Sequence, residues 1–569
     1  MQAKGAKLSE LLGHQEKQFI IPIYQRSYKW TKRHLDRLLE DLSDIEYGNA
    51  KHSHFLDSIV YAGIQVQQAS MSHTTLKFQV IDGQQRLTTI SLLLIAIRDR
   101  LKELTEDTEA ERLNNIYIIN QYAREYDDKL RLRLSETDHP VYEKLVFGDE
   151  ITPEEKKGLI YKNFLIHKKF ISEMSIDELK ILILKFEERI DIIDTFLEPH
   201  DNPQKIFSSL NSTGKELKDS DLVKNYVLMN LPSDKQVEFY NRFWRNIEDK
   251  LQNNETILMN FLQHYLTMKS DSGFVVTTGA IYETFEKYFV SENKRNSTGE
   301  IAFIEKLLQD MMSYTDVYKR LFLDYDRVDF AYTQNSIRQL GIESYYPLVM
   351  KISHECSQEL DPVYKVIENY LIRRFAVGLP AGKTKIVFAK ATKNLDIAPT
   401  SSNLGEKLLK ILKSEQKQNR YPNDNEFHDS LKHSPLYSNS SKATKYVLYK
   451  AEYFKNTQNR TQTVNYEDLT VEHILPQTEY ANLGNCWTYS FDLGEYEKYV
   501  HTLGNLTLVT QEKNSQLGNR CFDEKKSIYQ TDSFMMTKEL ESKYSDWSSE
   551  EIKKHADEMI DECVMKIWG

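Results

Sequence analysis

The segment VIDGQQRLTTI, residues 80–90, says most about the fold of this chain. The apolar run over 77–81 predicts a strand, Asp82-Gly83-Gln84 a tight turn, and residues 85–101 a buried helix. The start of a helix presents free backbone N–H groups, which bind phosphate. Arg86 adds a guanidinium able to hold a phosphate through two hydrogen bonds, and Asp82 could hold Mg²⁺ or a water molecule. The segment therefore predicts a phosphate-binding turn between a strand and a helix.

Two other segments belong to the same part of the chain. IIPIYQRSYKW, residues 20–30, predicts a short strand and a turn before a helix, and it supplies the amide and cation of Gln25-Arg26. FSSLNSTGKELKDSDLVKN, residues 207–225, predicts a loop over 211–214 between helices at 203–210 and 219–229. Strands are also expected over 55–64 and 189–197. This part of the chain is therefore expected to contain both strands and helices.

These three segments resemble the N-terminal domain of GmrSD-like proteins, a ParB/sulfiredoxin-like fold associated with nucleotide binding. The resemblance implies an NTP, of unknown identity, and NTP hydrolysis at Asp82 and Arg86. Residue by residue, it implies that the nucleotide contacts Gln25, Arg26, Asp82, Gly83, Gln84, Gln85, Arg86, Asn211, Gly214 and Asp221. One position departs from the family, because Asp57 stands where glycine is common.

The other end of the chain contains VEHILPQ, residues 471–477, and LGNLTLVTQEKN, residues 503–514. The carboxylate of Glu472 and the amide oxygen of Asn514 are hard ligands of the kind that Mg²⁺ or Mn²⁺ prefers. The imidazole of His473 can take a proton from water. The amide of Asn505 can fix the orientation of that imidazole. The pattern predicts a nuclease site with a single metal ion.

This pattern resembles the HNH, or ββα-metal, nucleases. The resemblance implies that Glu472 and Asn514 hold the metal, that His473 is the general base, and that Asn505 completes the catalytic site by holding the His473 ring through a hydrogen bond. Glu472 is itself a departure, because many of these sites have aspartate there. The structural zinc that many HNH proteins carry on four cysteines is not expected, because the cysteines here are dispersed.

The two resemblances occur in the order found in GmrSD-like proteins, which are prokaryotic restriction factors that couple nucleotide hydrolysis to cleavage of modified foreign DNA. We therefore expect an α+β multidomain chain with three parts. They are a ParB/sulfiredoxin-like domain at 1–230, a mostly helical linker and DNA-contacting domain at 231–459, and a ββα-metal (HNH-like) domain at 460–569. The prediction that the middle part is helical rests on apolar residues at helical spacing, as in 301–322.

Composition limits the remaining choices. The chain has 569 residues, 40% hydrophobic and 28% charged, which is typical of a multidomain globular protein. No apolar run approaches the ~18 residues of a membrane span, and no secretory segment is recognisable, so no membrane partner and a cytoplasmic location are expected. The four cysteines are scattered without a CxxC, which argues against a disulfide framework.

Charge is distributed unevenly. Residues 371–460 contain 17 basic residues (Lys and Arg) and 7 acidic residues (Asp and Glu). Residues 461–569 contain 10 basic and 20 acidic residues. The basic segment predicts DNA phosphate contacts, and the alternative is that two oppositely charged domains simply pack together. The predicted DNA-binding residues are Arg373, Arg374, Lys383, Lys385 and Lys513.

The function expected from the whole sequence is an NTP-dependent or NTP-regulated endonuclease that acts on modified double-stranded DNA. Two alternatives stay open. One is a nucleotide-dependent sensor of modified DNA with little or no cleavage, and the other is an RNase or toxin built on the same fold. A homo-oligomer is compatible with the sequence.

Overall fold

The computed structural model describes residues 1–569 except 15, 47–52, 65–74, 124, 199, 202–205, 207–217, 325–332, 460–465 and 533. The chain divides into two compact units. Unit 1 comprises Met1–Asp249 and Tyr282–Gln309, and unit 2 comprises Lys250–Ile281 and Asp310–Gly569. The three-part division expected from the sequence stays a prediction.

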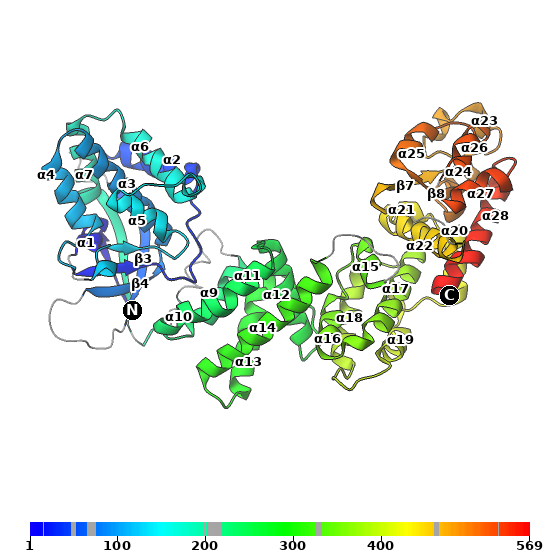
Figure 1. Cartoon of the computed structure of the whole chain (residues 1–569), viewed down its shortest axis with the longest axis horizontal. Coiled ribbons are helices and arrows are strands. Elements are labelled where there is room, and N and C mark those ends of the chain that lie inside the picture. The colour runs from blue at the N-terminus through cyan, green and yellow to red at the C-terminus, as the bar shows by residue number, and fades with distance from the viewer. Residues whose placement is uncertain are drawn as a thin grey trace. The chain divides into compact units, whose positions relative to one another are not determined.

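Unit 1 contains a mixed six-stranded sheet in the order β1-β6-β3-β4-β2-β5. Figure 1 labels two of its strands, β3 and β4. β3 pairs antiparallel with β4 and parallel with β6, and β2 pairs parallel with β4. The strands are β1 (Gln2–Lys7), β2 (Lys17–Ile20), β3 (His54–Gly63), β4 (Leu76–Asp82), β5 (Leu132–Arg133) and β6 (Ile190–Leu197).

The central helix of unit 1 is α3 (Gln84–Glu103), which directly follows β4 and is buried along most of its length. It packs against α4 (Asp107–Leu113) and α6 (Leu159–Ile171). Gly83 makes the turn into α3 with φ +93°, and a Cβ there would lie 2.5 Å from Ile59 Cδ1. The other α-helices among the described residues of the N-terminal segment are α1 (Leu8–Leu12), α2 (Lys32–Asp44), α5 (His139–Phe147), α7 (Ile176–Arg189), α9 (Asp219–Met229) and α10 (Ser233–Phe239).

The described residues in the middle of the chain are mostly helical, as the sequence predicts. Its helices are α11 (Arg245–Lys250), α12 (Glu255–Lys269), α13 (Ile281–Arg295), α14 (Glu300–Phe322), α15 (Thr333–Ser336), α16 (Tyr346–Glu355), α17 (Leu360–Ala376), α18 (Thr384–Asn394), α19 (Leu404–Ser414), α20 (Asp424–His433), α21 (Leu436–Asn439) and α22 (Ser441–Asn459). None of the described helices is both long and apolar enough to cross a membrane.

The C-terminal part of unit 2 is built around two short antiparallel strands, β7 (Leu469–His473) and β8 (Leu506–Thr510). Glu472 pairs with Thr507 and His473 with Leu506, and α25 (Gln511–Leu517) follows β8 directly. The surrounding helices are α23 (Asn485–Thr488), α24 (Leu493–Tyr499), α26 (Phe522–Gln530), α27 (Met535–Lys543), α28 (Ser549–Met559) and α29 (Met565–Trp568). The α+β multidomain fold is thus confirmed.

One expectation from composition is corrected here. Cys486 and Cys521 form a disulfide, although the scattered cysteines argued against a disulfide framework. The bond joins α23 to the residue that precedes α26, and these elements are 35 residues apart in sequence. Only the fold brings the two thiols together, so no local spacing could reveal the pair. Cys356 and Cys563 are free and buried.

Candidate functional sites

The two N-terminal motifs meet at the start of α3. Gln84 Nε2 donates to Gln25 Oε1 at 3.0 Å, and Gln25 Nε2 donates to the Ile81 carbonyl at 3.0 Å. Gln85 Oε1 accepts a hydrogen bond from the Lys29 backbone N–H at 2.7 Å. All three glutamines are buried, so their amides hold the 21–30 loop against the strand and helix.

The third motif reaches the same loop through Asn225 of α9. Its amide faces the carbonyl oxygens of Asp221 and Tyr24, and it donates to both when its nitrogen is turned toward them. The Asp221 carboxylate lies 3.6 Å from Lys224 Nζ. Asn211 and Gly214, which the resemblance places in the nucleotide pocket, lie outside the described residues.

A small cavity lies where these motifs meet. Its lining includes Arg26, Gln84, Gln85, Ser135 and Asp138, and its volume of about 10 Å³ is enough for one water molecule. Among the described residues, the buried Nε of Arg26 has no hydrogen-bond partner. A phosphate would therefore find an unused cation here, but it would have to displace part of the loop.

Asp138 is a member of this cavity that the sequence did not indicate. Its carboxylate accepts a hydrogen bond from the Tyr28 backbone N–H at 2.6 Å, and burial raises the pKa of this carboxyl. It precedes α5, as many aspartates precede helices, so the sequence offers no reason to separate it from an ordinary cap.

Arg86 points away from this cavity, toward β3. Its guanidinium donates to the Ser58 carbonyl and forms an ion pair with Asp57, whose carboxylate lies 2.9 Å away. Asp57 has φ +81°, a left-handed conformation that explains why glycine suits this position. Arg26 and Arg86 thus lie in different surroundings rather than side by side. Asp82, the last residue of β4, pairs with Val60 of β3.

The C-terminal site is centred on His473, the last residue of β7. Its Nε2 lies 3.1 Å from Nδ1 of His501, and the ring of Tyr437 packs edge-on against it with centroids 4.5 Å apart. Burial, with smaller contributions from His501 and Lys525, lowers the pKa of His473 to about 3. The imidazole is therefore neutral near pH 7, the form that can accept a proton. Sequence reasoning missed His501, although it lies only four residues before Asn505.

Glu472 faces the opposite side of the strand, as alternation predicts. Its Oε1 accepts from Lys525 Nζ at 2.7 Å and from the Tyr529 hydroxyl at 3.3 Å. Lys525 is fully buried and also donates to the carbonyls of His473 and Ile474, at 3.0 and 3.1 Å. The carboxylate is therefore already neutralised by a buried ammonium, and as placed it does not fit the role of a metal ligand.

Asn505 has a different role from the one predicted. Its Oδ1 accepts from the Leu475 N–H at 2.7 Å and from Trp547 Nε1 at 3.1 Å, and its Nδ2 donates to the carbonyls of Leu475 and Val500, both at 2.9 Å. With both protons and both lone pairs used, the amide holds the backbone after β7 and cannot orient the His473 ring.

Asn514 lies in the middle of α25, and its Nδ2 donates to the Val471 carbonyl of β7 at 3.1 Å. It therefore joins the helix to the strand that carries Glu472 and His473.

Among the described residues, the one cluster of three or more His, Cys, Asp or Glu side chains with metal-ligand spacing is Glu198, His200 and Asp201, in unit 1. The N-terminal ammonium of Met1 lies 2.6 Å from Asp201 and 3.1 Å from Glu198, so it already neutralises these carboxylates.

Both ends of the chain match domains of one known protein family. Residues 8–228 match the N-terminal domain of GmrSD restriction endonuclease, and residues 421–562 match the C-terminal domain of GmrSD restriction endonucleases. The chain belongs to this family. It is accordingly a nuclease that acts on DNA. A comparison with curated proteins gives no match. The C-terminal match begins at 421, so the GmrSD C-terminal domain includes α21 and with it Tyr437.

The DNA-binding residues predicted for this GmrSD protein need correction. Arg373 and Arg374 lie on α17 with exposed fractions of 3% and 2%. Arg373 donates to the Trp568 and Pro422 carbonyls, and Arg374 donates to the Gln418 and Pro380 carbonyls. Both guanidiniums are therefore internal supports for neighbouring segments, and neither faces solvent where DNA would bind.

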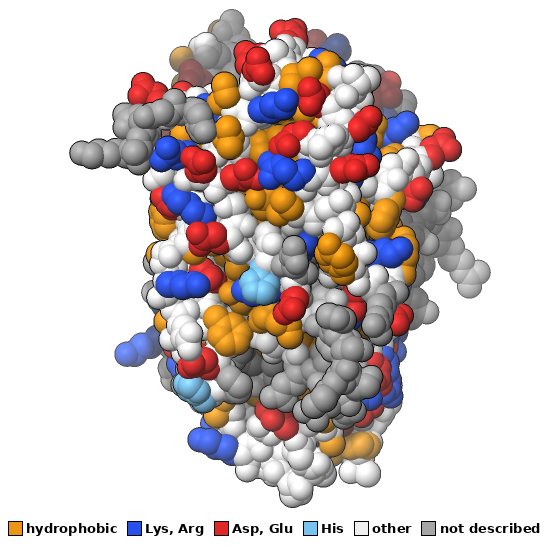
Figure 2. All heavy atoms as spheres, turned by 90° about the vertical axis from the view of Figure 1, so that its left-hand side faces the viewer, with side chains coloured by type: hydrophobic (Ala, Val, Ile, Leu, Met, Phe, Trp, Pro, Cys, Tyr) orange, Lys and Arg blue, Asp and Glu red, His pale blue; other side chains and the backbone are white. Residues whose placement is uncertain are grey.

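The three predicted lysines differ from one another. Lys383 and Lys385 are exposed, as a phosphate contact requires. Lys513 Nζ is held by the Thr531 carbonyl at 2.8 Å and by Asp532 at 3.1 Å. Figure 2 shows the N-terminal side of the molecule instead, where acidic and basic side chains are interspersed among the described residues without an extended basic patch.

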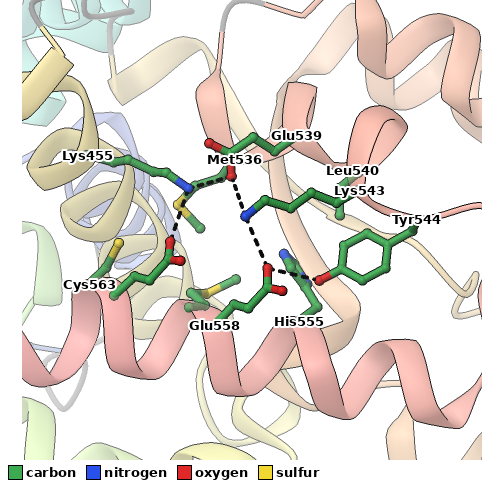
Figure 3. Close-up of a pocket in the computed structure, with 11 residues that line it drawn as sticks. Lys455, Met536, Glu539, Leu540, Lys543, Tyr544, His555, Glu558 and Cys563 are labelled. Atoms are coloured by element: carbon green, nitrogen blue, oxygen red, sulfur yellow. Dashed lines mark hydrogen bonds and ion pairs between the residues drawn. The ribbon is translucent and has the colours of Figure 1, made fainter.

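A further cavity of the C-terminal domain lies between α22, α27 and α28 (Figure 3). Lys455 contacts Glu539 at 2.5 Å, and Lys543 contacts Glu539 and Glu558 at 2.9 and 3.1 Å. Tyr544 donates to Glu558 at 3.2 Å. The volume is about 20 Å³, enough for little more than one water, so this paired network joins three helices and is not a ligand pocket.

Proposed function

We propose that this GmrSD-family protein is an NTP-dependent or NTP-regulated endonuclease that nicks or cuts modified foreign DNA in anti-phage defence. His473 is the general base that takes a proton from the attacking water. The N-terminal α+β domain, of the ParB/sulfiredoxin-like kind, binds and hydrolyses the NTP. The C-terminal domain, of the HNH-like kind, cleaves the DNA.

The observation that carries this proposal is the position of His473. Its imidazole lies at the end of β7, and β7, β8 and α25 supply the two antiparallel strands and the following helix that the proposal requires. Lys525 holds its carbonyl and Asn505 holds the residues that follow, so the ring projects from a fixed backbone. A fixed imidazole is what general-base catalysis requires.

A divalent cation, Mg²⁺ or Mn²⁺, is part of the proposal, where it would stabilise the charge that develops on the phosphate. Asn514 remains a candidate ligand through its amide oxygen. Glu472 is paired with Lys525, so we assign no step of the reaction to a metal held by Glu472.

The nucleotide part of the proposal is supported by the three N-terminal motifs meeting at the start of one helix. Arg26 offers an unused donor there, and the backbone N–H groups at the start of α3 favour phosphate. Arg86 is paired with Asp57, so it would contact a phosphate only if that ion pair broke and the phosphate took the place of the Asp57 carboxylate.

The test is cleavage of plasmid DNA, modified and unmodified, with Mg²⁺ or Mn²⁺ and with each NTP in turn. The parent protein is compared with His473→Ala and with a control, His433→Ala, at an exposed histidine at the end of α20. Loss of a general base typically costs ~10²–10⁴-fold in rate. His473→Ala should lose nicking by such a factor, while His433→Ala cleaves normally.

Other outcomes select the alternatives. Cleavage by His473→Ala at the parent's rate contradicts the proposal. Binding of modified DNA without cleavage under any condition favours the sensor. Cleavage of RNA in preference to DNA favours the RNase or toxin.

A further inference from the structure

His501 is the residue that contacts the His473 ring through a polar atom. The two rings are nearly perpendicular, at 84°, with His501 Nδ1 3.1 Å from His473 Nε2. This is hydrogen-bond distance, and one of the two nitrogens must carry the proton. The contact joins side chains 28 residues apart, so it is a product of the fold.

The three other side chains of the predicted nuclease site do not substitute for it. The Asn505 side chain, expected in this role, uses its full hydrogen-bonding capacity on Leu475, Val500 and Trp547. The Glu472 carboxylate is directed at Lys525 and Tyr529, on the other face of β7. Asn514 donates to the carbonyl of Val471.

His501 is itself held in place. Its backbone carbonyl accepts from the Tyr437 N–H at 3.2 Å, and its ring stacks on the Tyr437 ring at 16° with centroids 5.8 Å apart. Tyr437 also packs against the His473 ring in a T-shaped arrangement, so α21 supports both imidazoles. A residue positioned from two sides can in turn position another.

We propose that His501 is the positioning residue for His473, in the place that Asn505 was expected to fill. His473 donates its Nε2 proton to the lone pair of His501 Nδ1. The ring is then fixed in orientation and tautomer, and its own Nδ1 keeps a free lone pair. That nitrogen takes the proton of the attacking water. The inference rests on the proposed role of His473 as general base.

Four variants of the full-length protein test this inference. His501→Phe keeps a ring able to stack on Tyr437 but cannot accept a hydrogen bond, while His501→Gln restores an acceptor of similar reach. His433→Phe is the matched control, because it makes the same substitution at an exposed histidine at the end of α20 and should leave the rate unchanged. His473→Ala reports on the proposed function itself. For each protein we would measure kcat and KM for plasmid nicking, DNA affinity and the melting temperature.

Loss of an orienting partner typically lowers activity by ~10–100-fold. His501→Phe should therefore lose that factor in kcat with DNA affinity and melting temperature unchanged, and His501→Gln should recover most of it. Free imidazole should also partly restore a further variant, His501→Ala. A purely structural role for His501 would lower stability and DNA affinity together with rate, and Gln and imidazole would not restore it.

The failures can be told apart. If His473→Ala is inactive while His501→Phe nicks at the parent's rate, the positioning role is wrong and the general base stands. If His501→Phe loses rate only in proportion to stability, the role is likewise wrong. If His473→Ala nicks normally, the proposed function fails, and the positioning role fails with it.

Discussion

Replacing Lys525 by methionine should destabilise the β7–β8 region strongly. The side chain is fully buried, and its ammonium has three acceptors within 3.1 Å: Glu472 Oε1 and the carbonyls of His473 and Ile474. Burial raises the pKa of Glu472 and lowers that of Lys525, so each charge depends on the other. Removing one member of a buried pair typically costs ~3–5 kcal/mol, because the remaining charge has no partner.

Hydrogen exchange of the intact protein, followed by mass spectrometry, measures this locally. A loss of ~3–5 kcal/mol corresponds to amide exchange in β7 and β8 that is roughly a hundred- to a few thousand-fold faster. Peptides from β3 and β4 serve as an internal control. The double variant with Glu472→Gln removes both charges and should recover much of the protection. Unchanged exchange in Lys525→Met, or no recovery in the double variant, would refute the reasoning.

Three other predictions concern separate sites. Arg86→Ala should lose NTP hydrolysis in a phosphate-release assay while keeping the melting temperature near the parent's, and hydrolysis at the parent's rate would place the nucleotide elsewhere. Reversing the exposed Lys383 and Lys385 to glutamate should flatten the slope of log DNA affinity against log salt by about 0.9 for each DNA phosphate that is no longer neutralised. Arg373→Met, at a buried position, should lower stability and leave that slope unchanged. Burial lowers the pKa of His167 to about 3, against about 6.5 when unfolded, so stability falls as pH drops below about 6.5. His167→Phe should reduce that loss in urea unfolding at about pH 5 relative to about pH 7.

The elements that the sequence predicted well are those with a strong local pattern. The strand, glycine turn and helix of VIDGQQRLTTI appear as β4, Gly83 and α3, and the helix expected at 219–229 is α9 with those bounds. An apolar run followed by a glycine turn leaves few alternatives for the backbone. The same holds for β8, expected at 506–509 and found at Leu506–Thr510.

The predictions that needed correction concern what a polar side chain faces. Arg373 and Arg374 follow an apolar helical segment and belong to a basic stretch, so the sequence presents them as a surface cluster. Whether a guanidinium meets phosphate or a backbone carbonyl depends on segments tens to hundreds of residues away, here the 418–424 loop and Trp568. The pairing of Glu472 with Lys525 has the same origin, because 53 residues separate them.

The buried amides in the motifs at the two ends of the chain share one physical role. Gln25, Gln84 and Gln85 hold the 21–30 loop, and Asn505 holds the residues after β7, each through hydrogen bonds to other amides or to the backbone. Leaving such a buried partner unpaired costs ~1–3 kcal/mol. The amides therefore act as supports, while the chemistry falls to groups with an unused nitrogen, such as Arg26 and His473. If so, Asn505→Ala should lower the melting temperature and the cleavage rate together, whereas His473→Ala should lower the rate alone. An Asn505→Ala protein that melts like the parent yet fails to cleave would restore Asn505 to the reaction itself.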